Sequence, residues 1–190
     1  MTSLSLKVLV SAVTLGLSAG AFAAGAHGGG HHGEEGGHAA DGHHSAGSIG
    51  QPGKAEDVVR TVDITMYDNY YEPEVIDVSQ GETVRIRVTN QGALVHEFNI
   101  GTAAMHQAHQ KEMMMMVEHG VLLGDRIDHD MMNMDMGNGH TMKHDDPNSV
   151  LLEPGQSGEI IWTFSQQSSL EFACNVPGHY QAGMYGEIDI

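Results

Sequence analysis

The sequence of 190 residues predicts an all-β fold, a small Greek-key sandwich interrupted by one long insertion. Apolar residues alternate with polar ones in two blocks, 58–100 and 150–190, as in strands that bury one face. Turns rich in Gly and Pro divide both blocks into short strands, which is typical of a β-sandwich. Residues 101–149 do not alternate, so we expect them to form an insertion between the blocks.

The first block of alternation begins at Val58. Val62, Ile64 and Met66 are separated by polar residues, so their side chains point to one face of a strand. A turn at Gly81, which can take a positive φ, precedes a further strand of the same kind. We expect the strands of this block at 62–66, 74–78, 84–88 and 94–100.

The second block follows a turn at 153–156 that contains Pro and Gly. Large apolar residues then recur at every second position, as in strands packed on a core. We expect the strands of this block at 160–164, 170–174 and 185–190.

The N-terminal residues 1–23 have the pattern of a cleaved secretory signal peptide. Lys7 precedes an uncharged apolar run, 8–22, that ends in the small-x-small sequence Ala21-Phe22-Ala23. The alternative is a membrane anchor, but the run is shorter than the roughly 20 apolar residues that a span requires. We therefore expect a periplasmic protein with no membrane segment after cleavage.

Residues 24–57 are expected to be disordered, which leaves 58–190 as the folded domain. Gly, Ala, Ser and His dominate up to residue 53, and no apolar periodicity offsets the entropy of ordering. Six histidines lie in this segment, and they either bind metal ions or form part of a hydrophilic tether.

The formal net charge of −17 argues against nucleic acid as a partner, because binding it requires cations that neutralise phosphates. Acidity favours solubility and the attraction of cations, including metal ions. Solvation alone accounts for much of this charge.

Cys174 is the one cysteine of the chain, and it begins a loop in which His179 and Met184 follow at intervals of five residues. A single thiol in a secreted protein forms an intermolecular disulfide, reacts, or binds metal. Pro177 and Gly178 turn the chain between these residues, so one tight loop can direct a thiolate, an imidazole and a thioether to one point.

A thiolate with two imidazoles and a weak axial thioether is the ligand set of a blue-copper site. The best candidate for the second imidazole is His96, which lies where one expected strand begins. Taken singly, His96 is also compatible with a hydrogen-bonded structural histidine, Met184 with core packing and Cys174 with a buried thiol.

These motifs together resemble the cupredoxin family. The resemblance rests on Tyr71-x-Pro73, on 81–84, on Asn90 followed by His96, and on the Cys-x4-His-x4-Met sequence at 174–184. It covers 58–100 and 150–190 and leaves out the two segments of biased composition.

The resemblance implies a cupredoxin-like Greek-key β-sandwich that binds one type 1 copper, as Cu(I) or Cu(II). The implied ligands are His96, Cys174, His179 and Met184. A secretory signal together with a His- and Met-rich insertion is most similar to the periplasmic copper-tolerance cupredoxins of Gram-negative bacteria.

Glu97 departs from the pattern of many electron-carrier cupredoxins, which have Asn after the first His ligand to tie the two ligand loops together. A carboxylate near the metal would favour the oxidised ion and lower the reduction potential. We also expect the backbone N–H of Val176 to reach the Cys174 sulfur, since Pro177 has no N–H to donate.

The insertion contains ten of the 13 methionines and six of the histidines. A helix is expected over 103–123, where good helix formers occur without Pro, and a loop beyond Gly124. Met113–Met116 would cover every face of that helix, so we expect them to pack. The segment 131–144 combines thioethers, which select Cu(I), with imidazoles, which suit Cu(II), and we expect extra copper ions there.

The leading hypothesis is a copper-binding protein that protects against excess copper in the periplasm. The alternative is a blue-copper electron carrier that shuttles single electrons between redox partners. The expected partners are copper ions and a periplasmic redox or copper-handling protein. We do not expect an enzyme, because the His-Cys-His and His-x-His pairs that build multi-copper oxygen sites do not occur.

Overall fold

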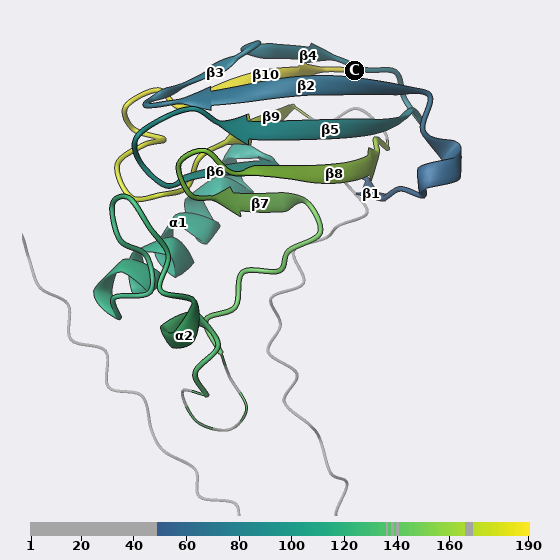
Figure 1. Ribbon diagram of the computed structural model, residues 1–190. Helices are drawn as coiled ribbons and strands as arrows, with labels where there is room; N and C mark the ends of the chain where they lie inside the picture. Colours follow the sequence, from purple (N-terminus) through teal and green to yellow (C-terminus); the bar gives the residue numbers. More distant parts are fainter. Residues whose placement is uncertain (1–48, 136, 138, 140, 166–168) are drawn as a thin grey trace, which may run out of the picture. The chain divides into compact units, whose positions relative to one another are not determined.

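Two five-stranded sheets form the body of the protein (Figure 1). The computed structural model describes residues 49–135, 137, 139, 141–165 and 169–190. The first sheet contains, in spatial order, β1 (Gln51–Pro52), β8 (Ser157–Thr163), β5 (Thr83–Asn90), β2 (Arg60–Tyr67) and β3 (Tyr70–Glu72). The second contains β4 (Val75–Asp77), β10 (Tyr185–Asp189), β9 (Leu170–Ala173), β6 (His96–Gly101) and β7 (Ser149–Leu152). The all-β sandwich predicted from the sequence is confirmed.

The core lies between the sheets and follows the predicted alternation. In β5, Val84, Ile86 and Val88 are fully buried, while Arg85 and Arg87 between them point outward. β5 pairs in parallel with β2 and antiparallel with β8, so it lies at the centre of its sheet. β3 and β7 were not predicted, because neither contains a long enough run of alternating residues.

Residues 49–57 are ordered, so the prediction of disorder up to residue 57 is wrong there. β1 pairs with β8, and η2 (Ala55–Asp57) follows as a single 3-10 turn. The Trp162 indole donates to the carbonyl of Ile49 at 3.0 Å, and Ile49 itself is buried. One isolated apolar residue in a Gly-rich stretch gives no periodic signal, although a distant Trp supplies its partner. The expected signal peptide and most of the His-rich segment lie outside the described residues.

The insertion contains the expected helix, here α1 (Ala103–Glu118), and a short second helix, α2 (His129–Met132). The Thr102 hydroxyl accepts from the Met105 N–H at the start of α1. α1 packs against β6 and β9, and Figure 1 shows α1 and α2 together beside the strands. No helix in the described part of the chain is long and apolar enough to cross a membrane.

A second apolar cluster joins the insertion to the sandwich. Met113 and Met116 of α1 pack there with Val95, which precedes β6. Met114 and Met115 are exposed, so the expected packing of four methionines applies to two of them. The other buried members of the cluster are Val121, Leu122, Ile127 and Met132.

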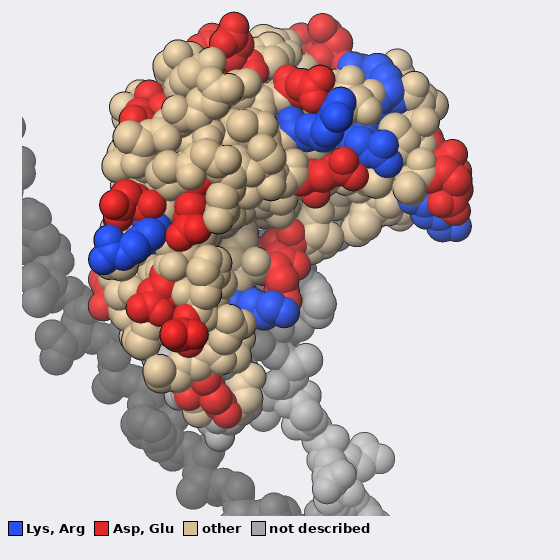
Figure 2. All heavy atoms as spheres, in the orientation of Figure 1, with Lys and Arg blue, Asp and Glu red and all other residues tan. Residues whose placement is uncertain are grey.

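Acidic residues outnumber basic ones by 25 to 8, in keeping with the net charge. Figure 2 shows acidic side chains spread over one face, with basic side chains beside them. Arg60–Glu82, Arg85–Glu159 and Arg87–Asp63 are examples of such ion pairs.

Gly186 in β10 lies where no side chain fits. A Cβ there would overlap the Phe172 ring and the carbonyl oxygen of Glu74, whereas a Cβ on Gly124 would meet nothing. We predict that Gly186→Ala lowers the free energy of unfolding by about 1–3 kcal/mol through overpacking. Denaturant unfolding measures this, with Gly124→Ala as control. Equal stability of the two variants would contradict the packing of β10 against β9 and β4.

Candidate metal centre

The loop that joins β9 to β10 closes on itself and brings its expected ligands together. The Cys174 N–H donates to the Met184 carbonyl at 3.1 Å, and the Met184 N–H donates to the His179 carbonyl at 3.0 Å. Gly178 has a φ of 91°, which lets the chain reverse just before His179. Cys174 and Met184 are both fully buried in the main core.

Three of the four expected ligands converge through their donor atoms. The Nδ1 atoms of His96 and His179 are 3.2 Å apart, and the Cys174 sulfur lies 3.9 Å and 3.4 Å from them respectively. Ligands placed about 2.0–2.3 Å from one ion have separations of this size. The site therefore fits a metal ion held by one sulfur and two nitrogens, with Met184 buried at the end of the same loop.

Asp68, in the turn between β2 and β3, orients His96. Its Oδ1 lies 2.8 Å from His96 Nε2, so the Nδ1 lone pair of the ring faces Cys174. The same carboxylate accepts from the backbone N–H groups of Ala93 and Leu94, which fixes the approach to β6. We did not predict this role from the sequence, because Asp is common in turns for local reasons.

Burial keeps both imidazoles ready to act as ligands. It lowers the pKa of His96, although Asp68 opposes the change. It also lowers the pKa of His179, and the nearby His96 ring lowers it further. Neutral rings retain the lone pair that binds a metal.

The Cys174 thiol is held in its protonated form until a cation arrives. Burial, together with the negative charge of Glu97, raises its pKa to about 12. The backbone N–H groups of Glu97 and Val176 donate to the sulfur and oppose this rise, as expected for Val176. A bound metal ion would reverse the balance, because a coordinated thiol loses its proton.

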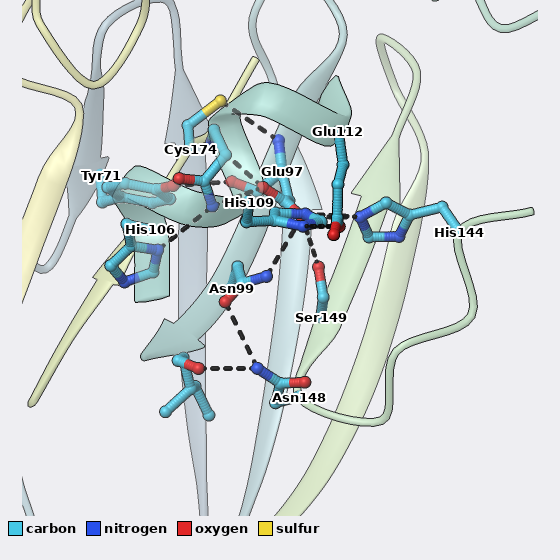
Figure 3. Close-up of polar contacts among 12 residues, drawn as sticks. Tyr71, Glu97, Asn99, His106, His109, Glu112, His144, Asn148, Ser149 and Cys174 are labelled. Atoms are coloured by element: carbon cyan, nitrogen blue, oxygen red, sulfur yellow. Dashed lines mark hydrogen bonds and ion pairs between the residues drawn. The ribbon is translucent and has the colours of Figure 1, made fainter. Parts of the chain in front are cut away.

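Glu97 ties the two ligand segments together, the task that Asn performs in many electron carriers. One carboxylate oxygen, Oε2, accepts from the Asn175 N–H at 3.1 Å and from its side-chain amide at 2.8 Å. The Tyr71 hydroxyl donates to the Glu97 backbone carbonyl at 2.6 Å. His96 and Cys174 are thus joined through their chain neighbours Glu97 and Asn175. Figure 3 shows Glu97 beside Cys174.

The other oxygen, Oε1, meets two histidines of the insertion. His109 of α1 lies 2.9 Å from it and His144 lies 2.7 Å from it (Figure 3). Burial alone would raise the pKa of Glu97, but the hydrogen bonds and charges of the two histidines outweigh it and hold this pKa well below its ordinary value. The insertion therefore reaches the centre of the site. We did not predict this cluster, although the sequence had marked both Glu97 and the histidine-rich insertion.

The side chains of the Met- and His-rich segment 131–144 differ in their exposure and direction. Met132 is buried, Met134 is exposed, and His144 turns inward to Glu97. Met136 and His140 lie outside the described residues.

Comparison with known proteins identifies the family. Residues 45–122 match the family model of a cupredoxin-like domain. The chain is 48% identical over 149 residues to the copper-resistant cuproprotein CopI of Pseudomonas aeruginosa. The aligned region covers 75% of this chain and 82% of that protein. The chain belongs to the cupredoxin family.

Further similarities agree with this assignment. The cupredoxin is 39% identical over 140 residues to the copper-resistant cuproprotein CopI of Rubrivivax gelatinosus, with 73% of this chain and 71% of that protein covered. Its fold resembles that of auracyanin B, with a TM-score of 0.52 and 18% identity over 74% of this chain and 95% of that one.

Stability should depend on pH through His109. Burial alone would lower its pKa, but Glu97 and Glu112 raise it from 6.5 to about 9. A raised pKa contributes stability that is complete below pH 6.5 and is lost as the pH rises through 9. We predict that the metal-free protein loses on the order of 2 kcal/mol of unfolding free energy across this window.

Denaturant unfolding at several pH values measures the loss. The slope should shrink markedly in Glu97→Gln, where only Glu112 still raises the pKa of His109, and should persist in His119→Gln, which alters an exposed histidine at the end of the same helix. A wild-type slope in Glu97→Gln would show that the pair does not control it.

Proposed function

We propose that this cupredoxin binds one type 1 copper through His96, Cys174, His179 and Met184 and contributes to copper tolerance in the periplasm. The observation that carries the proposal is the convergence of the Cys174 sulfur with the Nδ1 atoms of both histidines. The curated relatives are named copper-resistant cuproproteins, which supports the same role here.

The donor set favours copper over other metals. Soft thiolate and thioether ligands select Cu(I), while imidazole suits both oxidation states. Bound copper would supply reversible one-electron chemistry. The surrounding residues hold the donors in place, since Asp68 fixes His96 and two backbone N–H groups hold the sulfur. A binding protein that handles the ion, with no reaction of a further substrate, is the role that we propose.

Extra copper in the segment 131–144 is part of the proposal. Met134 is exposed and stands among other thioethers and imidazoles in the sequence. Thioethers need no deprotonation and form no disulfides, so they stay available in an oxidising compartment.

Electron transfer between redox partners is the second candidate. The observation that favours it is the partial exposure of His179, through which an electron could leave the site. A carrier needs the type 1 centre alone and makes no use of exposed methionines in the insertion.

Titration of the purified protein with Cu(II) tests the type 1 centre. We predict an intense thiolate-to-copper absorption that saturates at one equivalent, because the sole cysteine allows one such bond. Cys174→Ala should abolish the band, while circular dichroism confirms that the variant is folded. Absence of the band from the unmutated protein would refute the proposal.

Replacement of thioethers by isosteric leucines distinguishes copper collection from electron transfer. Deletion of 101–149 would remove His109 and His144 from Glu97, so substitution is the sharper test. We predict that Met134→Leu with Met136→Leu lowers the number of bound Cu(I) ions and weakens the copper tolerance of cells that depend on this protein. Met105→Leu with Met114→Leu is the matched control. Unchanged tolerance in the first variant would favour the electron carrier.

A further inference from the structure

We propose that Glu97, His109 and His144 form a second, ordered metal site that binds a cupric ion beside the type 1 centre. It goes beyond the copper collection proposed above, because it is built on β6 and α1 as well as on the Met- and His-rich segment. Its ligands are one carboxylate oxygen and two imidazole nitrogens.

The three donor atoms already have the separations of a coordination sphere. Glu97 Oε1 lies 2.9 Å from His109 Nε2 and 2.7 Å from His144 Nε2, and the two nitrogens are 3.2 Å apart. Ligands about 2.0–2.1 Å from one ion are about 2.9 Å apart at a right angle and about 3.3 Å apart at a tetrahedral angle. One ion can therefore contact all three with little rearrangement.

Hydrogen bonding alone leaves Glu97 Oε1 overcrowded. Besides both imidazoles, the Ser149 hydroxyl lies 2.7 Å from this oxygen and the Asn99 amide 3.3 Å from it. A carboxylate oxygen has about two lone pairs, fewer than the four groups directed at it. A shared cation resolves the conflict, since the imidazoles then turn lone pairs to the ion and Ser149 keeps its hydrogen bond.

The outer side of His109 is arranged as in known metal sites. Its Nδ1 lies 2.8 Å from Glu112 Oε2, one turn along α1. A carboxylate on the far nitrogen of a ligating histidine fixes the tautomer that offers the other nitrogen to the metal. The same bond would strengthen His109 as a ligand.

A route for the ion leads in from the surface. A cavity of about 390 Å³ is lined by His109 and His144 together with Glu112, His119 and the thioethers of Met115 and Met142. The ligands themselves are well shielded, with Glu97 fully buried and the His144 side chain 4% exposed. The cavity therefore places thioethers beside His109 and His144, two of the three ligands.

Cu(II) is the ion that this donor set holds best. Imidazole and carboxylate ligands suit several divalent ions, and among those of the first transition row the affinity is highest for Cu(II). The absence of sulfur from the three ligands separates this site from the thiolate centre, so the two have different spectra.

Glu97 also couples the two sites. Its Oε2 holds Asn175, and its N–H donates to the Cys174 sulfur at 3.4 Å. Where both imidazoles are neutral, a divalent ion on Oε1 cancels the negative charge of the carboxylate beside that sulfur. Reduced copper at the neighbouring centre then becomes relatively more stable, so the potential of that centre rises.

The test compares the purified wild-type protein with His144→Gln and with His129→Gln. The first variant removes a proposed ligand yet keeps an amide that can donate to Glu97, and the second removes an exposed histidine of the same insertion. Cu(II) is titrated while the thiolate absorption and the electron paramagnetic resonance spectrum are recorded. The thiolate band shows that each variant is folded.

We expect wild type and His129→Gln to bind an additional Cu(II) with a nitrogen and oxygen signature. His144→Gln should bind that ion at least about tenfold more weakly, with the thiolate band retained. Equal affinity in both variants would overturn the proposal and leave the cluster as a carboxylate paired with imidazolium groups. If the thiolate band were missing throughout, the type 1 proposal would fail while this site could still be counted.

Zn(II), which is redox-inert, tests the coupling. With Zn(II) added above pH 9, where His109 is neutral, the potential of the thiolate-bound copper should rise in wild type and in His129→Gln and stay constant in His144→Gln. A constant potential in wild type would overturn the coupling. Zn(II) that Cu(II) cannot displace would overturn the assignment of copper.

Discussion

The buried carboxylate of Glu97 is the interaction on which the rest of the site depends. It carries a charge into the interior, and this is tolerable only because donors surround both oxygens. Those donors come from the ligand loop, from α1, from the segment before β7 and from β7 itself. Elements that are distant in the sequence are therefore held together by their hydrogen bonds to the Glu97 carboxylate.

This dependence changes how the insertion is understood. A long segment between two strands usually tolerates deletion, because it adds little to the core. Here α1 contributes its own apolar cluster and one of the partners of Glu97. The insertion is part of the framework of the metal centre as well as a source of exposed thioethers.

The strands and the convergence of Cys174 with His179 were predictable because local patterns encode them. Alternation identified β2, β5 and β8, and the spacing of Cys174, His179 and Met184 predicted that one loop directs them to one point. Asp68 and the triad of Glu97, His109 and His144 have no such pattern, since the path of the chain alone decides that they meet. The ordered start at Ile49 was missed for the same reason, because its partner Trp162 lies far along the chain.

The two imidazoles that face Cys174 differ in their freedom. His96 is fully buried and anchored through Asp68, whereas His179 stands on a short loop that is partly open to solvent. His96 is thus the fixed ligand position of the centre and His179 the accessible one. The affinity for the ion is then set largely by the fixed position, while the rate at which the ion enters or leaves is set by the accessible one. The affinity and the exchange rate can therefore change independently.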